Sequence, residues 1–368
     1  MFQELLQRFR SRLFGHIDGP LLVITLAIMA FGLATIYSAT FDSNNRAINQ
    51  VLNLLIGLTV MWAVAQLPPQ KLMRFAVPLY VIGLVLLVMV FLVGVKVNGA
   101  RRWLSLGFIR IQPSEILKIA MPLMLAWYFH KYEAVLRVRH YAVAGLLLIV
   151  PFALIAKQPD LGTAILVGAA GFYVIFFAGL PWKVIVGMIA AAATAAPFVW
   201  TVLHGYQRKR ILTLIDPTTD PLGSGYHIIQ STIAIGSGGT FGKGWLEGTQ
   251  THLEFIPERH TDFIFAVFSE ERGLLGNSIL VLLYLLLIAR GLMITSNAST
   301  LFARVMGGSI TLSFFTYAFV NMGMVSGILP VVGVPLPFMS YGGTALVTLF
   351  LGLGILMSIH SHRMLVKQ

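Results

Sequence analysis

Long apolar segments alternate with short polar segments along almost the whole chain. Each holds about 17–25 residues, enough for a helix to cross a hydrocarbon layer of about 30 Å. The segments lack the alternation of barrel strands, and only helices and closed barrels satisfy every backbone polar group in lipid. The pattern predicts an all-α polytopic membrane protein of about ten transmembrane helices, near 19–40, 48–66, 74–95, 112–130, 140–157, 161–179, 182–203, 274–292, 302–327 and 340–360.

The chain reads as a single membrane domain over 1–368, without a detachable soluble domain. A large loop, 204–262, separates the seventh and eighth predicted helices. It mixes aromatic with charged residues, and Tyr226–Ile235 predicts a short helix in the membrane interface. A loop this long is usually functional rather than a linker.

Composition agrees with a membrane protein: 57% of residues are hydrophobic and 11% charged, against about 25% charged in soluble domains. There is no cysteine, which excludes disulfides and thiol nucleophiles. Arg8, Arg10 and Arg12 precede the first apolar segment. Because that segment is long and lacks a clear cleavage site, we expect a retained helix rather than a signal peptide.

The charges predict an orientation. With both termini in the cytoplasm, inner segments hold thirteen Lys and Arg and outer segments eleven. The margin widens when the long loop is discounted, since long loops cross the membrane largely regardless of charge. Eleven of fourteen acids then lie in or near outer loops. We expect a multi-pass membrane protein with both termini in the cytoplasm and an active site open to the outside; the alternative is that large loops simply carry solvating charge.

Three ionisable residues lie at the starts of predicted helices. Glu115 and Lys118, three residues apart, share one helix face, and Asp160 follows Pro159 at a later helix start. Ionisable residues inside a membrane are costly and usually face a cavity, so these three are candidate substrate-binding residues. The alternative is structural, an ion pair or a favourable charge at a helix start.

Two basic segments are candidates for binding a pyrophosphate. Arg101 and Arg102 stand beside Trp103. One guanidinium group can donate two parallel hydrogen bonds to the oxygens of a phosphate, and Trp is common at membrane interfaces. A plain interfacial anchor is the alternative. Lys243 lies in the glycine-rich stretch Gly236–Gly244, whose spacing is not that of a P-loop. This argues against a nucleotide site and leaves contact with a lipid pyrophosphate open.

Charged residues are densest at the end of the large loop. Asp262 lies there at the predicted water–membrane boundary, just before an apolar run. A carboxylate so placed could act as general base on a sugar hydroxyl. The alternative is that Thr261 or Asp262 caps the following helix. No known metal-ligand spacing is met by the nearby His252, Glu254, Glu258 and His260, so metal ligands stay unknown.

Five segments, in order along the chain, together resemble the SEDS family (shape, elongation, division and sporulation proteins). Two further stretches, Lys243–Gln250 and Glu258–Thr261, are similar to its RodA branch rather than its FtsW branch. The five segments are Gly99–Trp103, Gln112–Lys118, Gln158–Thr163, Leu253–Phe263 and Pro335–Gly343.

The resemblance implies a multi-pass peptidoglycan glycosyltransferase of the bacterial cytoplasmic (inner) membrane, with an extracytoplasmic active site. It would polymerise lipid II on the outer face of that membrane and release undecaprenyl pyrophosphate, for cell elongation and rod shape. The family's essential aspartate aligns with Asp262, the polar residues of its fourth helix with Glu115 and Lys118, and its helix-six acid with Asp160. The implied partners are a class B penicillin-binding protein (a transpeptidase), undecaprenyl-linked glycan and other elongation-complex proteins, with no nucleic acid. No cofactor is certain, but a divalent cation, Mg²⁺ or Mn²⁺, is a candidate.

The resulting hypothesis is that Asp262 activates a sugar hydroxyl, which displaces the lipid pyrophosphate with inversion while nearby cations stabilise the leaving group. Two prenyl tails would enter through a lateral opening between helices. The alternatives are a lipid II flippase and a structural scaffold. A flippase needs ionisable residues in both membrane halves, and here they thin out toward the inner half; a scaffold leaves the outer acids unexplained.

The chain departs from the family pattern twice. Arg272 follows Glu270 and Glu271 where the family usually has an apolar residue, which puts a carried-over role for both glutamates in doubt; Arg272 could simply pair with one of them. Thr344–Ala345 keeps one of two small hydroxyl residues, a mild change in packing.

Overall fold

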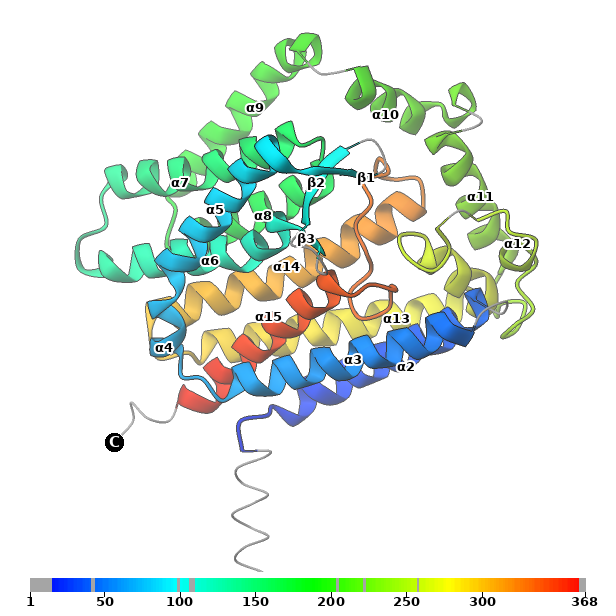
Figure 1. Cartoon of the computed structure of the whole chain (residues 1–368), viewed down its shortest axis with the longest axis horizontal. Coiled ribbons are helices and arrows are strands. Elements are labelled where there is room, and N and C mark those ends of the chain that lie inside the picture. Colours follow the sequence, from blue (N-terminus) through cyan, green and yellow to red (C-terminus); the bar gives the residue numbers. More distant parts are fainter. Residues whose placement is uncertain are drawn as a thin grey trace, which may run out of the picture.

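The computed structural model describes residues 15–40, 44–97, 100–105, 110–202, 205–220, 223–256 and 258–363. Within these ranges the protein is a bundle of α-helices with one small sheet (Figure 1). A helix occupies each predicted span: α2 (Gly19–Ala39), α3 (Asn44–Ala65), α5 (Ala76–Val93), α6 (Pro113–Lys131), α7 (Val138–Lys157), α8 (Leu161–Phe177), α9 (Trp182–Val202), α13 (Ile264–Ser296), α14 (Leu301–Val325) and α15 (Thr344–Ser361).

The expected class, an all-α polytopic membrane protein, is confirmed. In the described part of the chain, seven helices are long and apolar enough to cross a membrane: α2, α3, α5, α7, α13, α14 and α15. Shorter apolar helices cover Leu161–Phe177 and Trp182–Ala195. The remaining span, α6, carries Glu115 and Lys118 in its first two turns. Its polar start is part of the site described below.

The large loop between α9 and α13 is mostly helical. It contains α10 (Gly205–Ile215), the 3₁₀ turn η2 (Pro217–Thr219), α11 (Ser224–Ser237) and α12 (Thr249–His252). The short helix predicted over Tyr226–Ile235 lies within α11, which confirms the helix; its place in the membrane interface stays a prediction. α10 to α12 lie at one end of the bundle, away from the C-terminal end of the chain (Figure 1). Two short elements, α4 (Pro69–Arg74) and the 3₁₀ turn η1 (Glu133–Val135), complete the order.

A small antiparallel sheet, which the sequence had not suggested, precedes α6. Its strands are β1 (Val95–Val97), β2 (Ala100–Ser105) and β3 (Arg110–Ile111), in the order β1-β2-β3. Arg101 pairs with Lys96, and Leu104 with Ile111. The sheet returns the chain to the start of α6 with Arg102 close by. We call this end of the bundle, with β1–β3, α10–α12 and the 326–343 segment between α14 and α15, the loop-rich end.

α13 begins ten residues before the predicted span. The span expected over 274–292 is only its second part, because the helix is broken at Gly273 (φ 62°, ψ −161°). A break leaves backbone groups without helical partners. The glycine-rich stretch of the loop supplies them, through the hydrogen bonds Lys243 N to Glu270 O (3.0 Å), Gly244 N to Glu271 O (3.1 Å), Leu274 N to Gly239 O (2.9 Å) and Leu275 N to Thr240 O (3.0 Å).

The glycines in this stretch permit that close approach. A Cβ built at Gly242, whose φ is 84°, would lie 2.0 Å from the Glu271 carbonyl oxygen. A side chain there would collide with the backbone of α13 as well as strain its own. The glycine-rich sequence therefore serves loop–helix packing.

Candidate active site

Asp262 lies where the large loop meets α13, and its backbone is held by α14. Its carbonyl oxygen accepts a hydrogen bond from Asn321 Nδ2 at 2.8 Å, and the same nitrogen donates to Val334 O at 2.7 Å. Beside it, Ser340 Oγ donates to the Thr261 carbonyl at 2.7 Å. The start of α13 is thus fastened to α14 and to the segment that follows α14.

The carboxylate of Asp262 has no cation or hydrogen-bond donor among the described residues. A Cβ built at Gly333 (φ 71°) would lie 3.3 Å from Asp262 Oδ2, so the backbone of this segment passes close to the carboxylate. Burial, together with the nearby charge of Glu258, raises the pKa of Asp262 to about 6. A base is most effective when its pKa is near the working pH.

The alternative interpretation of Asp262, as a helix cap, is wrong. The N-cap residue of α13 is Phe263, and no side chain caps its first amides. Thr261 Oγ1 points elsewhere, donating to the carbonyl of Glu258 at 3.2 Å and to its carboxylate at 3.0 Å. The carboxylate of Asp262 is therefore not used to end a helix.

Glu115 and Lys118 form an ion pair at the start of α6, with Lys118 Nζ 2.7 Å from Glu115 Oε1. Lys118 is buried, and its ammonium lies 5.3 Å from the centre of the Tyr317 ring on α14. Thr348 Oγ1 of α15 donates to Glu115 Oε2 at 3.4 Å. The pair is therefore enclosed by three helices.

Asp160 links α8 to α6 and to β2. Its Oδ1 accepts from the Thr163 amide at 3.3 Å, so it caps α8, as the structural alternative had it. The same oxygen lies 3.7 Å from Arg102 Nη1, and Oδ2 accepts from Gln112 Nε2 at 3.0 Å. Arg102 also donates to the carbonyl oxygens of Gln158 and Pro159. We call Arg102, Glu115, Lys118 and Asp160 the charge-paired group.

Asp262 and the charge-paired group adjoin at the loop-rich end. A Cβ built at Gly162, two residues after Asp160, would lie 2.5 Å from the Val332 carbonyl oxygen, and the next residue, Gly333, faces Asp262. One segment thus contacts both. The structure brings together five of the eight predicted site residues: Arg102, Glu115, Lys118, Asp160 and Asp262.

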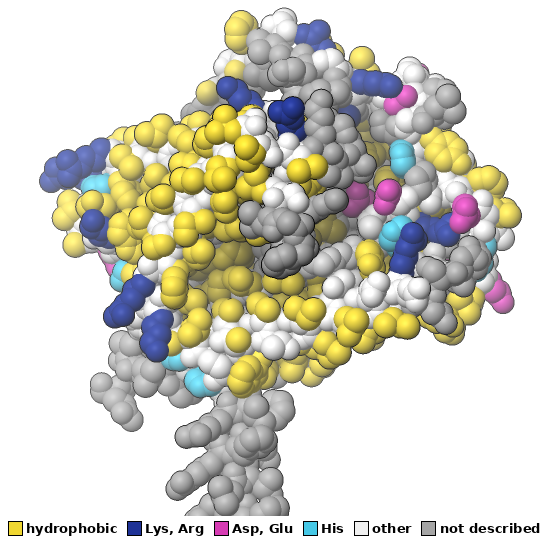
Figure 2. Space-filling view, viewed as in Figure 1, with side chains coloured by type: hydrophobic (Ala, Val, Ile, Leu, Met, Phe, Trp, Pro, Cys, Tyr) yellow, Lys and Arg dark blue, Asp and Glu magenta, His cyan; other side chains and the backbone are white. Residues whose placement is uncertain are grey.

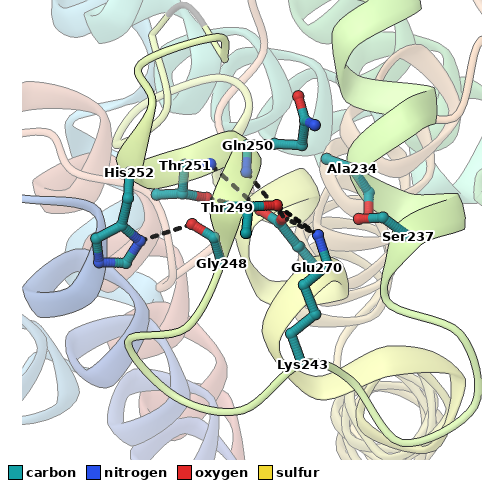
Figure 3. Close-up of polar contacts among 9 residues, drawn as sticks. All are labelled: Ala234, Ser237, Lys243, Gly248, Thr249, Gln250, Thr251, His252 and Glu270. Carbon is teal, nitrogen blue, oxygen red and sulfur yellow. Dashed lines mark hydrogen bonds and ion pairs between the residues drawn. The ribbon is translucent and has the colours of Figure 1, made fainter.

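The other three lie differently. Arg101 is exposed on β2, and Trp103 is partly buried opposite Val95 of β1. Lys243 belongs to a separate cluster, where its ammonium lies 2.8 Å from Glu270 Oε1 and 2.6 Å from Thr249 Oγ1 (Figure 3). Their contact with a pyrophosphate stays a prediction, and for Lys243 the geometry favours a structural role.

Glu270 is the centre of that cluster. It is fully buried and also accepts hydrogen bonds from the Gln250 amide at 2.9 Å and from the amide and hydroxyl of Thr251 at 3.2 and 3.1 Å (Figure 3). Its ion-pair partner is Lys243 rather than Arg272. Glu271 also holds the large loop, because its Oε1 accepts from the Leu246 amide at 3.3 Å. Both glutamates that Arg272 had put in doubt therefore anchor this loop.

Sequence reasoning missed three residues of the site. Gln112 was predicted only as part of the segment Gln112–Lys118, and Tyr317 and Asn321 were not predicted as site residues. The signal for the last two was present: with Ser313 they are polar residues four positions apart in a predicted span, and so share one helix face.

A large apolar cavity reaches the charge-paired group. It has a volume of about 660 Å³, and Figure 2 shows the hydrophobic surface hollowed there, between α6 and α15. Its polar lining is at the loop-rich end, where Gln112 and Glu115 meet Thr344 and Thr348. Toward α4 the lining is apolar. The shape suits a long apolar chain with a polar head.

Metal binding by protein side chains alone is not supported in the described ranges, because no three His, Asp or Glu side chains there come together as ligands. Mg²⁺ often binds through one or two carboxylates together with substrate phosphates. Asp160 and Asp262 are the carboxylates that could complete such a site, and the ion would supply charge stabilisation to a leaving pyrophosphate.

Fold and site together define a polytopic membrane protein with a charged pocket at one end of its bundle. The family model FTSW_RODA_SPOVE, described as cell cycle protein, matches residues 20–365. The chain belongs to this family, called SEDS above.

Its relatives and similar structures cover nearly the whole chain. It is 50% identical over 354 residues to the Escherichia coli K12 peptidoglycan glycosyltransferase MrdB, covering 96% of each chain. It is 31% identical to the Treponema pallidum peptidoglycan glycosyltransferase RodA, covering 96% of this chain and 100% of that one.

Two solved structures share the fold. One is described by the words "Structural coordination of polymerization and crosslinking by a peptidoglycan synthase complex". It matches with a TM-score of 0.82 and 36% identity, covering 94% of this chain and 98% of that one. The Thermus thermophilus rod shape determining protein RodA matches with a TM-score of 0.71, 31% identity and coverage of 94% and 97%.

Proposed function

We propose that Asp262 is the general base with which this peptidoglycan glycosyltransferase extends glycan strands from lipid II. The carboxylate takes the proton of a sugar hydroxyl as the hydroxyl oxygen attacks the anomeric carbon of the second substrate. The bond from that carbon to the pyrophosphate oxygen breaks, undecaprenyl pyrophosphate leaves, and the configuration inverts. Positioned general-base help is worth about 10²–10⁴-fold in rate.

One observation carries this assignment: Asp262 is a partly buried carboxylate that has no hydrogen-bond or ion-pair partner among the described residues. Buried polar groups are normally satisfied, and a perturbed carboxylate in a cleft is a candidate catalytic group. Its pKa of about 6 leaves it ionised at neutral pH yet basic enough to accept a proton.

The leaving pyrophosphate needs cationic stabilisation, which the charge-paired group offers. Lys118 and Arg102 are each held by a carboxylate, so their positions are fixed before substrate arrives. A pyrophosphate carries more charge than either carboxylate and can share both cations. Fixed donors avoid the reorganisation that mobile side chains would need.

The apolar cavity supports a lipid-linked substrate. A prenyl tail along its apolar wall would leave the pyrophosphate beside Gln112 and Glu115. This favours an enzyme over the flippase alternative, because the described residues that line the cavity toward α4 include no ionisable side chain that could carry a charged headgroup across. The lateral opening would then lie between α3 and α15 on one side and α5 and α6 on the other.

The loop-rich end is assigned to the outside of the cytoplasmic membrane, with both termini in the cytoplasm. The support is the distribution of charge: acidic side chains gather over the loop-rich end in Figure 2, while Lys131, Arg137 and Arg139 flank η1 at the opposite end. A class B penicillin-binding protein is the proposed partner, because one similar structure is described as coordinating polymerization with crosslinking.

The test is polymerisation in detergent, where sidedness is lost. Purified protein with its transpeptidase partner is given lipid II, and products are separated by length. Glycan chains are expected from the wild type and none from Asp262→Asn. A flippase or a scaffold would yield no polymer in either sample, and that result would overturn the proposal.

A further inference from the structure

α14 carries a stripe of polar residues that faces the site from within the bundle. Ser313, Tyr317 and Asn321 are spaced by four residues and so lie on one helix face. α14 is also the most enclosed of the long apolar helices, with 72% of its apolar window buried. Polar side chains buried this deeply destabilise the fold unless they are hydrogen-bonded.

Asn321 and Tyr317 contact different halves of the site. Asn321 donates both of its described hydrogen bonds to carbonyls, one of them that of Asp262. One turn earlier, about 6 Å along the axis, the ring of Tyr317 lies under the Lys118 ammonium. Two neighbouring turns therefore hold the base and a cation of the same reaction.

The environment of Lys118 makes the ring important. A cavity of about 30 Å³ adjoins it, lined by Lys118, Ser313, Tyr317 and Thr348 among others. Dense packing therefore does not fix the ammonium on that side. Glu115 holds it on one side, and the aromatic face supplies a second contact, which for a desolvated cation is worth about 2 kcal/mol. The Tyr317 hydroxyl is buried and also interacts with the Lys118 ammonium, while no described carbonyl or carboxylate accepts its proton.

α14 is itself fixed against α8. Ser309 Oγ donates to Ala170 O at 2.7 Å, and Thr316 Oγ1 and Tyr173 OH are 2.7 Å apart. These contacts leave little freedom for the helix to slide or rotate. A rigid helix can therefore set a distance between groups that hold on to it.

We propose that Tyr317 and Asn321 are positioning residues that use α14 to fix the separation of Lys118 and Asp262. Asp262 must reach the attacking hydroxyl while Lys118 meets the leaving pyrophosphate, so their spacing must match the two substrates. An error of about 1 Å in such a spacing can cost about 10²-fold in rate. The inference rests on the proposed roles of Asp262 and Lys118.

The first test concerns Tyr317 and uses the partner-bound protein with lipid II. Tyr317→Phe keeps the ring and should retain turnover within about threefold. Tyr317→Leu and the more flexible Tyr317→Met lose the aromatic face, and should lower kcat by about 10–100-fold with KM changed far less. Thr311→Val is the matched control, because it removes a buried hydroxyl of the same helix whose hydrogen bond, to Gly307 O at 2.8 Å, stays within α14 and holds no site residue; it should keep wild-type turnover.

The second test separates positioning from general stability. Asn321→Ala frees the backbone of Asp262, so its carboxylate should gain water and the acid limb of the pH–rate profile should move to lower pH. Tyr317→Leu should lower the plateau and leave that limb in place. Thermal unfolding of every variant identifies those that have simply lost the fold, and Tyr317→Met replaces Tyr317→Leu if the latter does not fold.

The outcomes are distinct. If folded Tyr317→Leu and Tyr317→Met match Thr311→Val in turnover, or if Asn321→Ala and Tyr317→Leu change the pH–rate profile in the same way, the positioning role is overturned. If instead Asp262→Asn polymerises normally, the proposed function fails, whatever the Tyr317 variants do.

Discussion

Glu270 and Asp262 stand eight residues apart at the start of the same helix, in opposite environments. Glu270 is fully buried and accepts hydrogen bonds from Lys243, Thr249, Gln250 and Thr251. The carboxylate of Asp262 accepts none from the described residues, and its pKa is raised to about 6. In the sequence alone both residues are simply acids near the predicted membrane surface, and nothing there distinguishes their environments.

The difference separates a carboxylate that holds structure from one that is available for chemistry. A satisfied buried carboxylate is stabilised in its charged form and has little tendency to take a proton. An unsatisfied one lies at higher energy and gains by accepting a proton from substrate. Pairs of acids in contrasting environments are how enzymes divide such roles.

The largest expected effect is that of Asp262→Asn. The amide cannot act as a base, so glycan polymerisation by the partner-bound enzyme should fall about 10²–10⁴-fold, while yield and detergent behaviour stay normal. Glu254→Gln is the matched control, because this loop acid pairs with Arg259 at 2.9 Å and is mostly exposed. Equal losses of activity in both variants would mean that acidic residues of this loop are needed in general. Asp262 would then have no special role.

Glu270→Ala should lower the stability of the protein, which Asp262→Asn should not. Removing one partner of a buried, hydrogen-bonded ion pair costs about 3–5 kcal/mol, so the thermal midpoint should drop clearly and activity should fall with it. Glu270→Gln keeps the shape and should lose less. If Glu270→Ala were as stable as the wild type yet inactive, Glu270 would belong to the catalytic machinery instead.

The fold was predictable because its signal is strong and local. Apolar segments of membrane length predicted the ten spans, and the structure has a helix in each, as α2, α5 and α15 illustrate. The break in α13 was not predictable, since Gly273, between Arg272 and the apolar run that follows, does not reveal that the loop from Gly239 to Gly244 will satisfy the backbone groups of the broken helix. That pairing connects residues about thirty positions apart.

The site was predictable only where motif and chemistry coincide. Asp262, Glu115 and Lys118 were candidates on both grounds. Lys243 was misleading, because a cation beside glycines is typical of phosphate binding, whereas its partner Glu270 comes close only through the fold. Tyr317 shows the reverse case: its importance depends on α14 packing against α6, which no local pattern contains.

The pH dependence of turnover should reflect the raised pKa of Asp262. Because the base must be ionised, kcat should fall about tenfold per pH unit below about pH 6. Glu258 contributes to the raised pKa, so Glu258→Gln should move this acid limb to lower pH by less than one unit. An acid limb near pH 4 in the wild type would show that Asp262 is not perturbed.

The smallest effect is on stability and has a defined sign. A pKa raised from 3.8 to about 6 means that the folded state binds the proton more tightly than the unfolded state. The stabilising contribution of Asp262 is therefore fully present below about pH 4, and is lost as pH rises to about 6; the difference is at most about 3 kcal/mol. Asp262→Asn should unfold at a higher temperature than the wild type at pH 8, and this gain should shrink toward pH 4. Glu270→Gln should show no such gain at pH 8, because there the charged form is hydrogen-bonded. An inactive Asp262→Asn that is less stable than the wild type at pH 8 would mean that the carboxylate holds structure after all, as Glu270 does.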